Sequence, residues 1–258
     1  IDASGLPDFE ALHQAIDEKT ALVSVMAANN EIGTLAPLAD IAALAHQHGA
    51  LFHTDAAQAV GKIPIDVNAM GIDLLSFSAH KLYAPKGVGF LYVRQKPRIP
   101  MISQMDGGGQ QGRFRSGTLA PALVVAMGKA CALTRDRLSE DADHARQMRA
   151  DFLECLDRAQ VRYVINGTME ARLPGNLNLH FPGIDEARLL SGLRGIAVSS
   201  GAACASAAGE PSYVLEALGL APDAIASSLR IGFGRGLSAD QVEQAAAELA
   251  RAVNTLRK

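Results

Sequence analysis

Short apolar runs alternate with amphipathic stretches along the first part of the chain. The runs predict strands at residues 21–27, 50–54 and 73–78. The amphipathic stretches repeat apolar residues at helical spacing and predict helices at residues 7–16 and 37–47. Strands and helices in alternation indicate a largely parallel sheet, because parallel neighbours are joined by long crossovers that are usually helical.

The remainder of the chain mixes helices and strands without this rhythm. A fourth short strand is predicted at residues 87–94, and a long helical region begins near residue 120. Further along, the pattern predicts strands at 161–165, 176–181 and 229–233, and helices at 185–193, 211–218, 222–227 and 240–256. We therefore expect a large α/β domain at residues 1–137 and a smaller α+β domain at residues 138–258.

Composition narrows the class of protein. The 258 residues are 48% hydrophobic and 20% charged, which is typical of a soluble globular protein. A net charge of −3 with dispersed positive residues gives no basic surface for nucleic acid, and no apolar run approaches the roughly 18 residues of a membrane span. Cys131, Cys155 and Cys204 are too few for a disulfide framework, and no signal peptide is found, which together favour the cytoplasm.

Polar residues gather directly after three of the predicted strands. They form three clusters, at residues 29–31, 53–58 and 78–81. Ligands bind at the carboxyl ends of strands in open α/β sheets, so we expect the clusters to face one crevice. Each cluster also has an ordinary explanation: asparagines form turns, Asp55 is suited to cap a helix, and Ser78 to satisfy backbone donors.

Lys81 lies beside Ser78 and His80 on the tight connection between two predicted strands. A lysine that attacks an aldehyde needs such a fixed place, with an amine kept neutral by desolvation or by nearby positive charge. A solvated surface lysine is the alternative. With Asp55 available for a pyridine nitrogen, and with hydroxyl and imidazole groups available for a phosphate, the clusters supply what pyridoxal 5'-phosphate requires.

Cys204 differs from the other two cysteines in its surroundings. Cys131 and Cys155 fall on apolar helical stripes and are predicted to be core thiols. Cys204 lies in a segment of serine, alanine and glycine, residues 199–210, which predicts a loop. A thiolate on a loop is able to approach a bound substrate, attack a sulfur atom and keep it as a persulfide.

From end to end, the sequence resembles the cysteine desulfurase family, in the group of the nitrogen-fixation and iron-sulfur-cluster enzymes. The resemblance is carried by six ordered motifs at residues 29–33, 53–58, 78–81, 115–118, 199–204 and 228–230. It implies pyridoxal-phosphate fold type I, with a mainly parallel sheet flanked by helices and a small C-terminal α+β domain. It also implies removal of sulfur from L-cysteine, giving L-alanine and a persulfide on Cys204.

The resemblance also implies roles for single residues. Lys81 would bind the cofactor as a Schiff base and later move protons. Asp55 would pair with the ring nitrogen and Gln58 would contact the phenolic oxygen. Ser78 and His80 would hold the phosphate.

Three further residues would complete the site. Thr118 would reach the phosphate of the neighbouring subunit, which makes a homodimer necessary. Arg230 would clamp the substrate carboxylate with help from Asn30, which is also expected to contact the cofactor; a bidentate guanidinium suits that planar anion. The sulfur would pass to an iron-sulfur scaffold or to another acceptor protein.

Two alternatives stay open. The chain is also compatible with a selenocysteine lyase or another class-V aminotransferase-like enzyme, and with an inactive fragment that only dimerises or binds sulfur acceptors. Family members carry roughly a third of their length before the point matched by Ile1, including a phosphate loop and a histidine that stacks on the cofactor. We therefore expect the chain to be a fragment. His46 and His48 are expected to be solvated rather than metal ligands.

Overall fold

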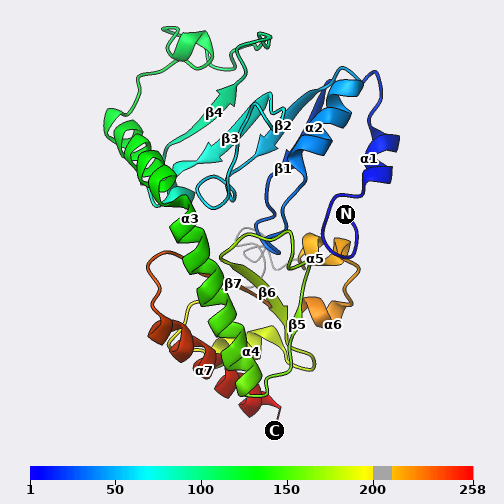
Figure 1. Ribbon diagram of the computed structural model, residues 1–258, viewed down its shortest axis with the longest axis vertical. Coiled ribbons are helices and arrows are strands. Elements are labelled where there is room, and N and C mark those ends of the chain that lie inside the picture. Colours follow the sequence, from blue (N-terminus) through cyan, green and yellow to red (C-terminus); the bar gives the residue numbers. More distant parts are fainter. Residues whose placement is uncertain (200–210, 258) are drawn as a thin grey trace. The chain divides into compact units, whose positions relative to one another are not determined.

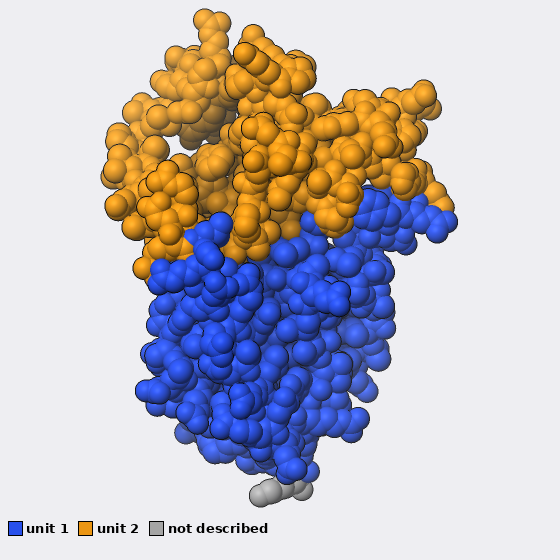
Figure 2. Space-filling model, viewed as in Figure 1, with its two compact units in different colours: residues 1–12, 28–36, 138–258 blue, residues 13–27, 37–137 orange. Residues whose placement is uncertain are grey.

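The structure is a computed structural model that describes residues 1–199 and 211–257 (Figure 1). It divides into two compact units (Figure 2): unit 1 comprises residues 1–12, 28–36 and 138–258, and unit 2 comprises residues 13–27 and 37–137. Segments 1–12 and 28–36 therefore group with the C-terminal part, whereas the sequence pattern placed them in the first domain. The two predicted domains stay a prediction.

The sheet of unit 2 has the order β1-β2-β3-β4. Its strands are β1 (Leu22–Met26), β2 (Leu51–Asp55), β3 (Leu74–Ser78) and β4 (Gly89–Val93). The first three pair in parallel, and β4 pairs with β3 in the antiparallel direction because only a tight connection joins them. The prediction of a mainly parallel sheet is confirmed.

One face of this sheet is partly covered by α2 (Leu38–Gln47), which packs against β1 and β2. The helix buries its apolar stripe, made of Leu38, Ile41, Ala42, Leu44 and Ala45. Helix α1 (Phe9–Ala15) buries no residue, and two 3₁₀ turns follow later in the chain, η1 (Ala79–Leu82) and η2 (Gln111–Arg113).

Helix α3 (Pro121–Arg158) is 38 residues long and spans the predicted boundary between the two domains. It continues without a break through Arg137 and Leu138, where the chain passes from unit 2 to unit 1. The two cysteines on it, Cys131 and Cys155, are half-buried rather than fully buried core thiols. The apolar stripes of α3 that carry these two cysteines therefore face the protein interior only in part.

Unit 1 is built around a second, antiparallel sheet of order β5-β6-β7. Its strands are β5 (Val164–Ile165), β6 (Asn176–His180) and β7 (Ser228–Gly232). Its helices, besides the end of α3, are α4 (Glu186–Gly192), α5 (Tyr213–Ala217), α6 (Pro222–Ile225) and α7 (Ala239–Leu256). Serine and aspartate begin three of them: Asp185, Ser212 and Ser238 each accept a backbone hydrogen bond as N-caps.

The two faces of the unit 1 sheet differ in polarity. Leu177, Leu179 and Leu229 alternate toward one face, where they form a core with Phe152 of α3 and Leu249 of α7. The intervening positions of β6 and β7 carry polar side chains, namely Asn176, Asn178, His180, Ser228 and Arg230. Because strand side chains alternate, these polar residues share the opposite face.

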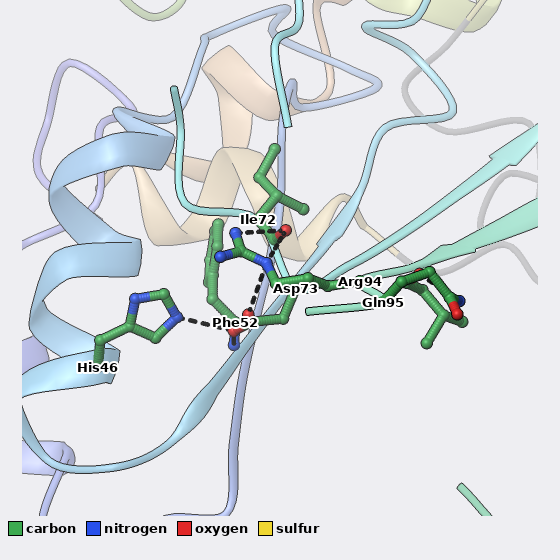
Figure 3. A network of polar contacts seen from close by, with 7 residues as sticks. His46, Phe52, Ile72, Asp73, Arg94 and Gln95 are labelled. Atoms are coloured by element: carbon green, nitrogen blue, oxygen red, sulfur yellow. Dashed lines mark hydrogen bonds and ion pairs between the residues drawn. The ribbon is translucent and has the colours of Figure 1, made fainter. Parts of the chain in front are cut away.

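At the opposite end of the unit 2 sheet from the carboxyl ends of β1 to β3, Asp73 joins four segments (Figure 3). Its carboxylate contacts His46 Nε2 at 2.7 Å and Arg94 Nε at 3.2 Å, and accepts a hydrogen bond from the Phe52 backbone N–H at 2.8 Å. Arg94 also donates to the carbonyl of Ile72 at 2.9 Å. His46 is exposed, as the sequence predicted, and it also pairs with Asp73, a partner 27 residues away that helical spacing alone does not reveal.

We expect Asp73→Asn to lower the free energy of unfolding of unit 2 by about 3 kcal/mol. The substitution removes a buried charge from Arg94 and leaves donors without a full acceptor. Urea unfolding followed by circular dichroism measures the change. The matched control is Glu18→Gln, an exposed charge in the same unit, which should change stability by less than about 0.5 kcal/mol.

Among the described residues, no helix is both long enough and apolar enough to span a membrane.

Candidate active site

Two of the predicted site residues end adjacent parallel strands. Asp55 is the last residue of β2 and Ser78 the last residue of β3. The register pairs Asp55 with Ser76, so Asp55 and Ser78 lie at the same edge of the sheet and, two positions apart in register, on the same face. Within unit 2 the sheet therefore brings these two clusters together.

Lys81 is presented by the 3₁₀ turn that follows β3. Ala79 and Leu82 are buried, and because residues three apart share a face of such a turn, they anchor it while His80 and Lys81 face outward. No hydrogen bond or ion pair joins the Lys81 amine to any described residue. Lys81 is exposed in the part of the chain that the structure describes.

Ser78 and His80 already contact each other. The Ser78 hydroxyl lies 3.0 Å from His80 Nδ1, within hydrogen-bond distance. The bond inside the pair uses one proton, so a hydroxyl and a neutral imidazole held together in this way offer an anion one donor, either the O–H or the Nε2–H. The pair is suited to the phosphate role that the sequence predicted for it.

Asp55 keeps one carboxylate oxygen available. Its Oδ1 accepts a hydrogen bond from the backbone N–H of Ala57 at 2.9 Å, which fixes the carboxylate, and its other oxygen has no partner among the described residues. Gln58 is held by Lys62, whose amine donates to Gln58 Oε1 at 3.0 Å. Its NH₂ group remains on the side away from that bond and is a donor.

The sheet face that carries Asp55 is open. It presents the alternate residues of all four strands: Leu22, Ser24, Met26, Leu51, His53, Asp55, Leu74, Ser76, Ser78, Gly89, Leu91 and Val93. None of these residues is buried, whereas Phe52, Thr54, Leu75 and Phe77 on the other face are. Strand alternation therefore places the candidate cofactor residues on the accessible side.

His53 also lies on this face, and no role was predicted for it. Its Nδ1 lies 2.7 Å from Ser24 Oγ and its Nε2 lies 3.1 Å from Ser76 Oγ, so three strands are linked beside Asp55. Burial lowers the pKa of His53, although the Asp55 carboxylate opposes this by favouring the charged ring. The imidazole therefore serves as a neutral brace.

We expect the stability of unit 2 to fall as the pH drops from about 7.5 to about 5.5. Because the folded protein depresses the pKa of His53, the unfolded chain binds the proton first, so the contribution of neutral His53 is present above the unfolded pKa and is lost below it. Thermal unfolding should show a smaller loss for His53→Gln than for the wild-type protein. The exposed His13→Gln serves as control, and an unchanged loss in His53→Gln would remove the assigned cause.

Asn30 and Arg230 meet in unit 1. Arg230 Nη1 donates to the carbonyl of Asn30 at 3.0 Å, and the guanidinium is half-buried. This bond orients the guanidinium and leaves further N–H groups for a carboxylate. Thr118 is exposed in unit 2, and Cys204 lies outside the described residues.

The residues of unit 2 fit pyridoxal phosphate by the chemistry of their donors. An amine without a partner, a carboxylate oxygen without a partner and a serine–histidine pair are presented near one sheet edge by Lys81, Asp55, Ser78 and His80. These groups match an aldehyde, a pyridine nitrogen and a phosphate. The predicted roles of the individual residues stay predictions.

Comparison with known proteins shows which family the chain matches. Residues 1–245 match the family model described as aminotransferase class-V. The chain is 46% identical over 256 residues to "Cysteine desulfurase IscS" of Vibrio atlanticus (strain LGP32), covering 99% of this chain and 63% of that protein. It thus spans a little under two thirds of the length of this curated relative.

Comparison with solved structures supports the same family. A "NIFS-LIKE PROTEIN" superposes with a TM-score of 0.89 at 32% identity, covering 99% of this chain and 67% of the other. "SspA in complex with cysteine" superposes with a TM-score of 0.75 at 32% identity, covering 90% and 64%. The sheet flanked by helices is therefore that of pyridoxal-phosphate fold type I, and the family's enzymes use that cofactor. The chain belongs to the aminotransferase class-V family, and its relatives within that family are cysteine desulfurases.

Proposed function

We propose that the protein containing this chain is a cysteine desulfurase, which transfers the sulfur of L-cysteine to Cys204 and releases L-alanine. The observation that carries the proposal is the edge of the unit 2 sheet, where an amine without a partner is presented next to the ends of β2 and β3. A curated relative that is 46% identical to the chain is named cysteine desulfurase, and one solved relative is described in complex with cysteine.

The cofactor of the proposed enzyme is pyridoxal 5'-phosphate. Lys81 would hold it through its amine, Asp55 would keep the ring nitrogen protonated, and Ser78 with His80 would bind the phosphate. When bound, the cofactor supplies an electron sink conjugated to the substrate amine. Gln58 would donate from its NH₂ group to the phenolic oxygen, since its carbonyl is occupied by Lys62.

Lys81 and Arg230 would act on the substrate itself. The guanidinium of Arg230, oriented by the carbonyl of Asn30, would bind the substrate carboxylate. The Asn30 side chain lies in the same turn and would contact substrate and cofactor. The Lys81 amine, once released from the cofactor, would remove the proton from the substrate α-carbon.

Cys204 would receive the sulfur. Its thiolate attacks the sulfur of the substrate thiol, so that a sulfur–sulfur bond forms and the carbon–sulfur bond of the substrate breaks. The electron pair of the broken bond passes to the substrate carbon skeleton, which takes up protons and leaves as alanine. Two thiols thus become one persulfide and one methyl group, without any external oxidant.

Two further parts of the proposal concern partners. Thr118, exposed on unit 2, would reach the cofactor phosphate of a neighbouring subunit in a homodimer. The persulfide would pass to an iron-sulfur scaffold or to another sulfur acceptor protein. The cytoplasmic location stays a prediction.

The proposed function is tested by incubating the protein that contains this chain with L-cysteine and a thiol reductant. We expect equal amounts of alanine and sulfide in the presence of pyridoxal phosphate. The same assay with L-selenocysteine separates a selenocysteine lyase, which would act on that substrate and leave cysteine almost untouched. Formation of neither product from either substrate would contradict the proposal.

A further inference from the structure

The segment that orients Arg230 is a tight turn built by its own side chains. Asn29 Oδ1 accepts hydrogen bonds from the backbone N–H groups of Glu31, at 2.8 Å, and Ile32, at 3.0 Å. Between them, the carbonyl of Asn30 accepts the bond from Arg230. The position of that carbonyl, and with it the guanidinium, therefore depends on what holds the peptide between residues 30 and 31.

Glu31, which follows this peptide, is itself held by three buried contacts. Its backbone carbonyl accepts from the side-chain amide of Asn176 at 3.2 Å and from that of Asn178 at 3.4 Å, on the polar face of β6. Its carboxylate Oε2 accepts from the hydroxyl of Ser212 at 2.6 Å, just before α5. Glu31 is 0% exposed, so these bonds are shielded from water.

The close approach of the turn to β6 is built into the backbone. Gly33 has a φ of 72°, and a Cβ at this position would lie 2.3 Å from Asn176 Oδ1. No side chain fits there. Asn178 stands opposite Arg230 in the register of β6 and β7, so the residue that binds the Glu31 carbonyl is also the cross-strand partner of Arg230.

The second carboxylate oxygen of Glu31 points to a role beyond packing. Oε1 is buried without a hydrogen-bond partner among the residues described. Leaving a buried acceptor unpaired costs about 1–3 kcal/mol, and folds retain such a cost mainly where function requires it. Because the side chain is fully buried, that role is exerted through neighbours rather than by touching a substrate.

We propose that Glu31 is a positioning residue for Arg230, acting through Ser212 and the peptide to Asn30. The carboxylate fixes the turn against α5, the carbonyl fixes it against β6, and the neighbouring carbonyl then holds the guanidinium in place for a carboxylate. This inference rests on the proposed function, since it takes Arg230 as the group that binds the substrate carboxylate.

Removing either end of the bond between Glu31 and Ser212 should weaken substrate binding. We expect Glu31→Ala and Ser212→Ala each to raise the KM for L-cysteine by about tenfold with kcat within about twofold, because a carboxylate is bound equally in ground and transition states. Binding of L-alanine, which has the same carboxylate, should weaken by the same factor in calorimetry. Glu31→Gln keeps an acceptor for Ser212 and should stay close to the wild-type protein.

Two comparisons separate positioning from general stability. Ser238→Ala removes an N-cap of α7 in the same unit without touching the turn, and should lower stability while leaving KM unchanged. In an Arg230→Ala background, Glu31→Ala and Ser212→Ala should add no further loss of L-alanine or L-cysteine binding. A missing additional effect is the signature of residues that act through one another.

The outcomes distinguish this proposal from the proposed function. Unchanged KM and unchanged L-alanine binding in both Glu31→Ala and Ser212→Ala, or a full additional loss in the Arg230→Ala background, would overturn the positioning role. A wild-type protein that forms no alanine from cysteine would overturn the proposed function instead. The L-alanine binding series would then still report whether Glu31 acts through Arg230.

Discussion

Replacing Lys81 with alanine should abolish alanine formation from L-cysteine, a loss of roughly 10³-fold or more. The amine is both the proposed link to the cofactor and the proposed carrier of the α-proton, so one substitution removes two functions. The protein should still fold, because Lys81 is exposed and bonds to no described residue. Amino-acid analysis measures the alanine, and the visible absorbance of the lysine-bound cofactor should disappear with it.

Two companion variants sharpen this test. Lys81→Arg keeps the positive charge but cannot provide a neutral amine, and should be as inactive as Lys81→Ala. Lys86→Ala removes an exposed lysine from the same connection between β3 and β4 and should keep both activity and absorbance. If Lys81→Ala retained the visible band or the wild-type rate, another residue would have to anchor the cofactor.

Cys204→Ala should keep the cofactor absorbance and lose sulfide formation by roughly 10²-fold or more, because the nucleophile is gone while the cofactor residues remain. Sulfide release in the presence of a reductant measures the loss. Cys204 lies outside the described residues, so this prediction rests on its sequence motif and on the proposed chemistry.

The other two cysteines supply matched controls. Cys131 is half-buried and burial raises the pKa of its thiol, which disfavours the thiolate. Cys155 packs beside the core of unit 1 and accepts a hydrogen bond from Arg158 at 3.0 Å. Cys131→Ala and Cys155→Ala should both remain active. Loss of activity in either, with Cys204→Ala unaffected, would place the sulfur acceptor elsewhere.

The elements of the fold were accessible from the sequence because their signals are local. Alternating apolar runs predicted β1, β2 and β3, and the helical spacing predicted α2 and α7, with ends that differ from the structure by at most one residue. The turn carrying Lys81 could also be placed, since a strand on each side leaves the chain only a few residues. These predictions depend on residues close together in the chain.

The parts that could not be predicted depend on contacts between distant residues. Glu31 and Ser212 are 181 positions apart, and no sequence pattern predicts that they contact each other. The grouping of residues 28–36 with the C-terminal part follows from bonds such as that between the Leu35 N–H and the Ala171 carbonyl, at 2.8 Å. His46 reaches Asp73 in the same way. Spacing along the chain carries no information on such pairs.

The sequence pattern predicted only part of what the structure shows about the open face of the unit 2 sheet. The sequence pattern predicts that the clusters containing Asp55 and Ser78 face one crevice, but it gives neither the register between β2 and β3 nor the face that is covered. The structure resolves this, because α2 packs on the other side. The brace formed by His53 with Ser24 and Ser76 then follows from register across three strands, which only the paired sheet provides.

The most direct test of the account is mass spectrometry of the peptide containing Cys204 after reaction with L-cysteine in the absence of reductant. The account predicts one added sulfur atom on Cys204, together with an equal amount of alanine, and neither in Lys81→Ala. Alanine and sulfide formed in the reaction while Cys204 carries no added sulfur would contradict it.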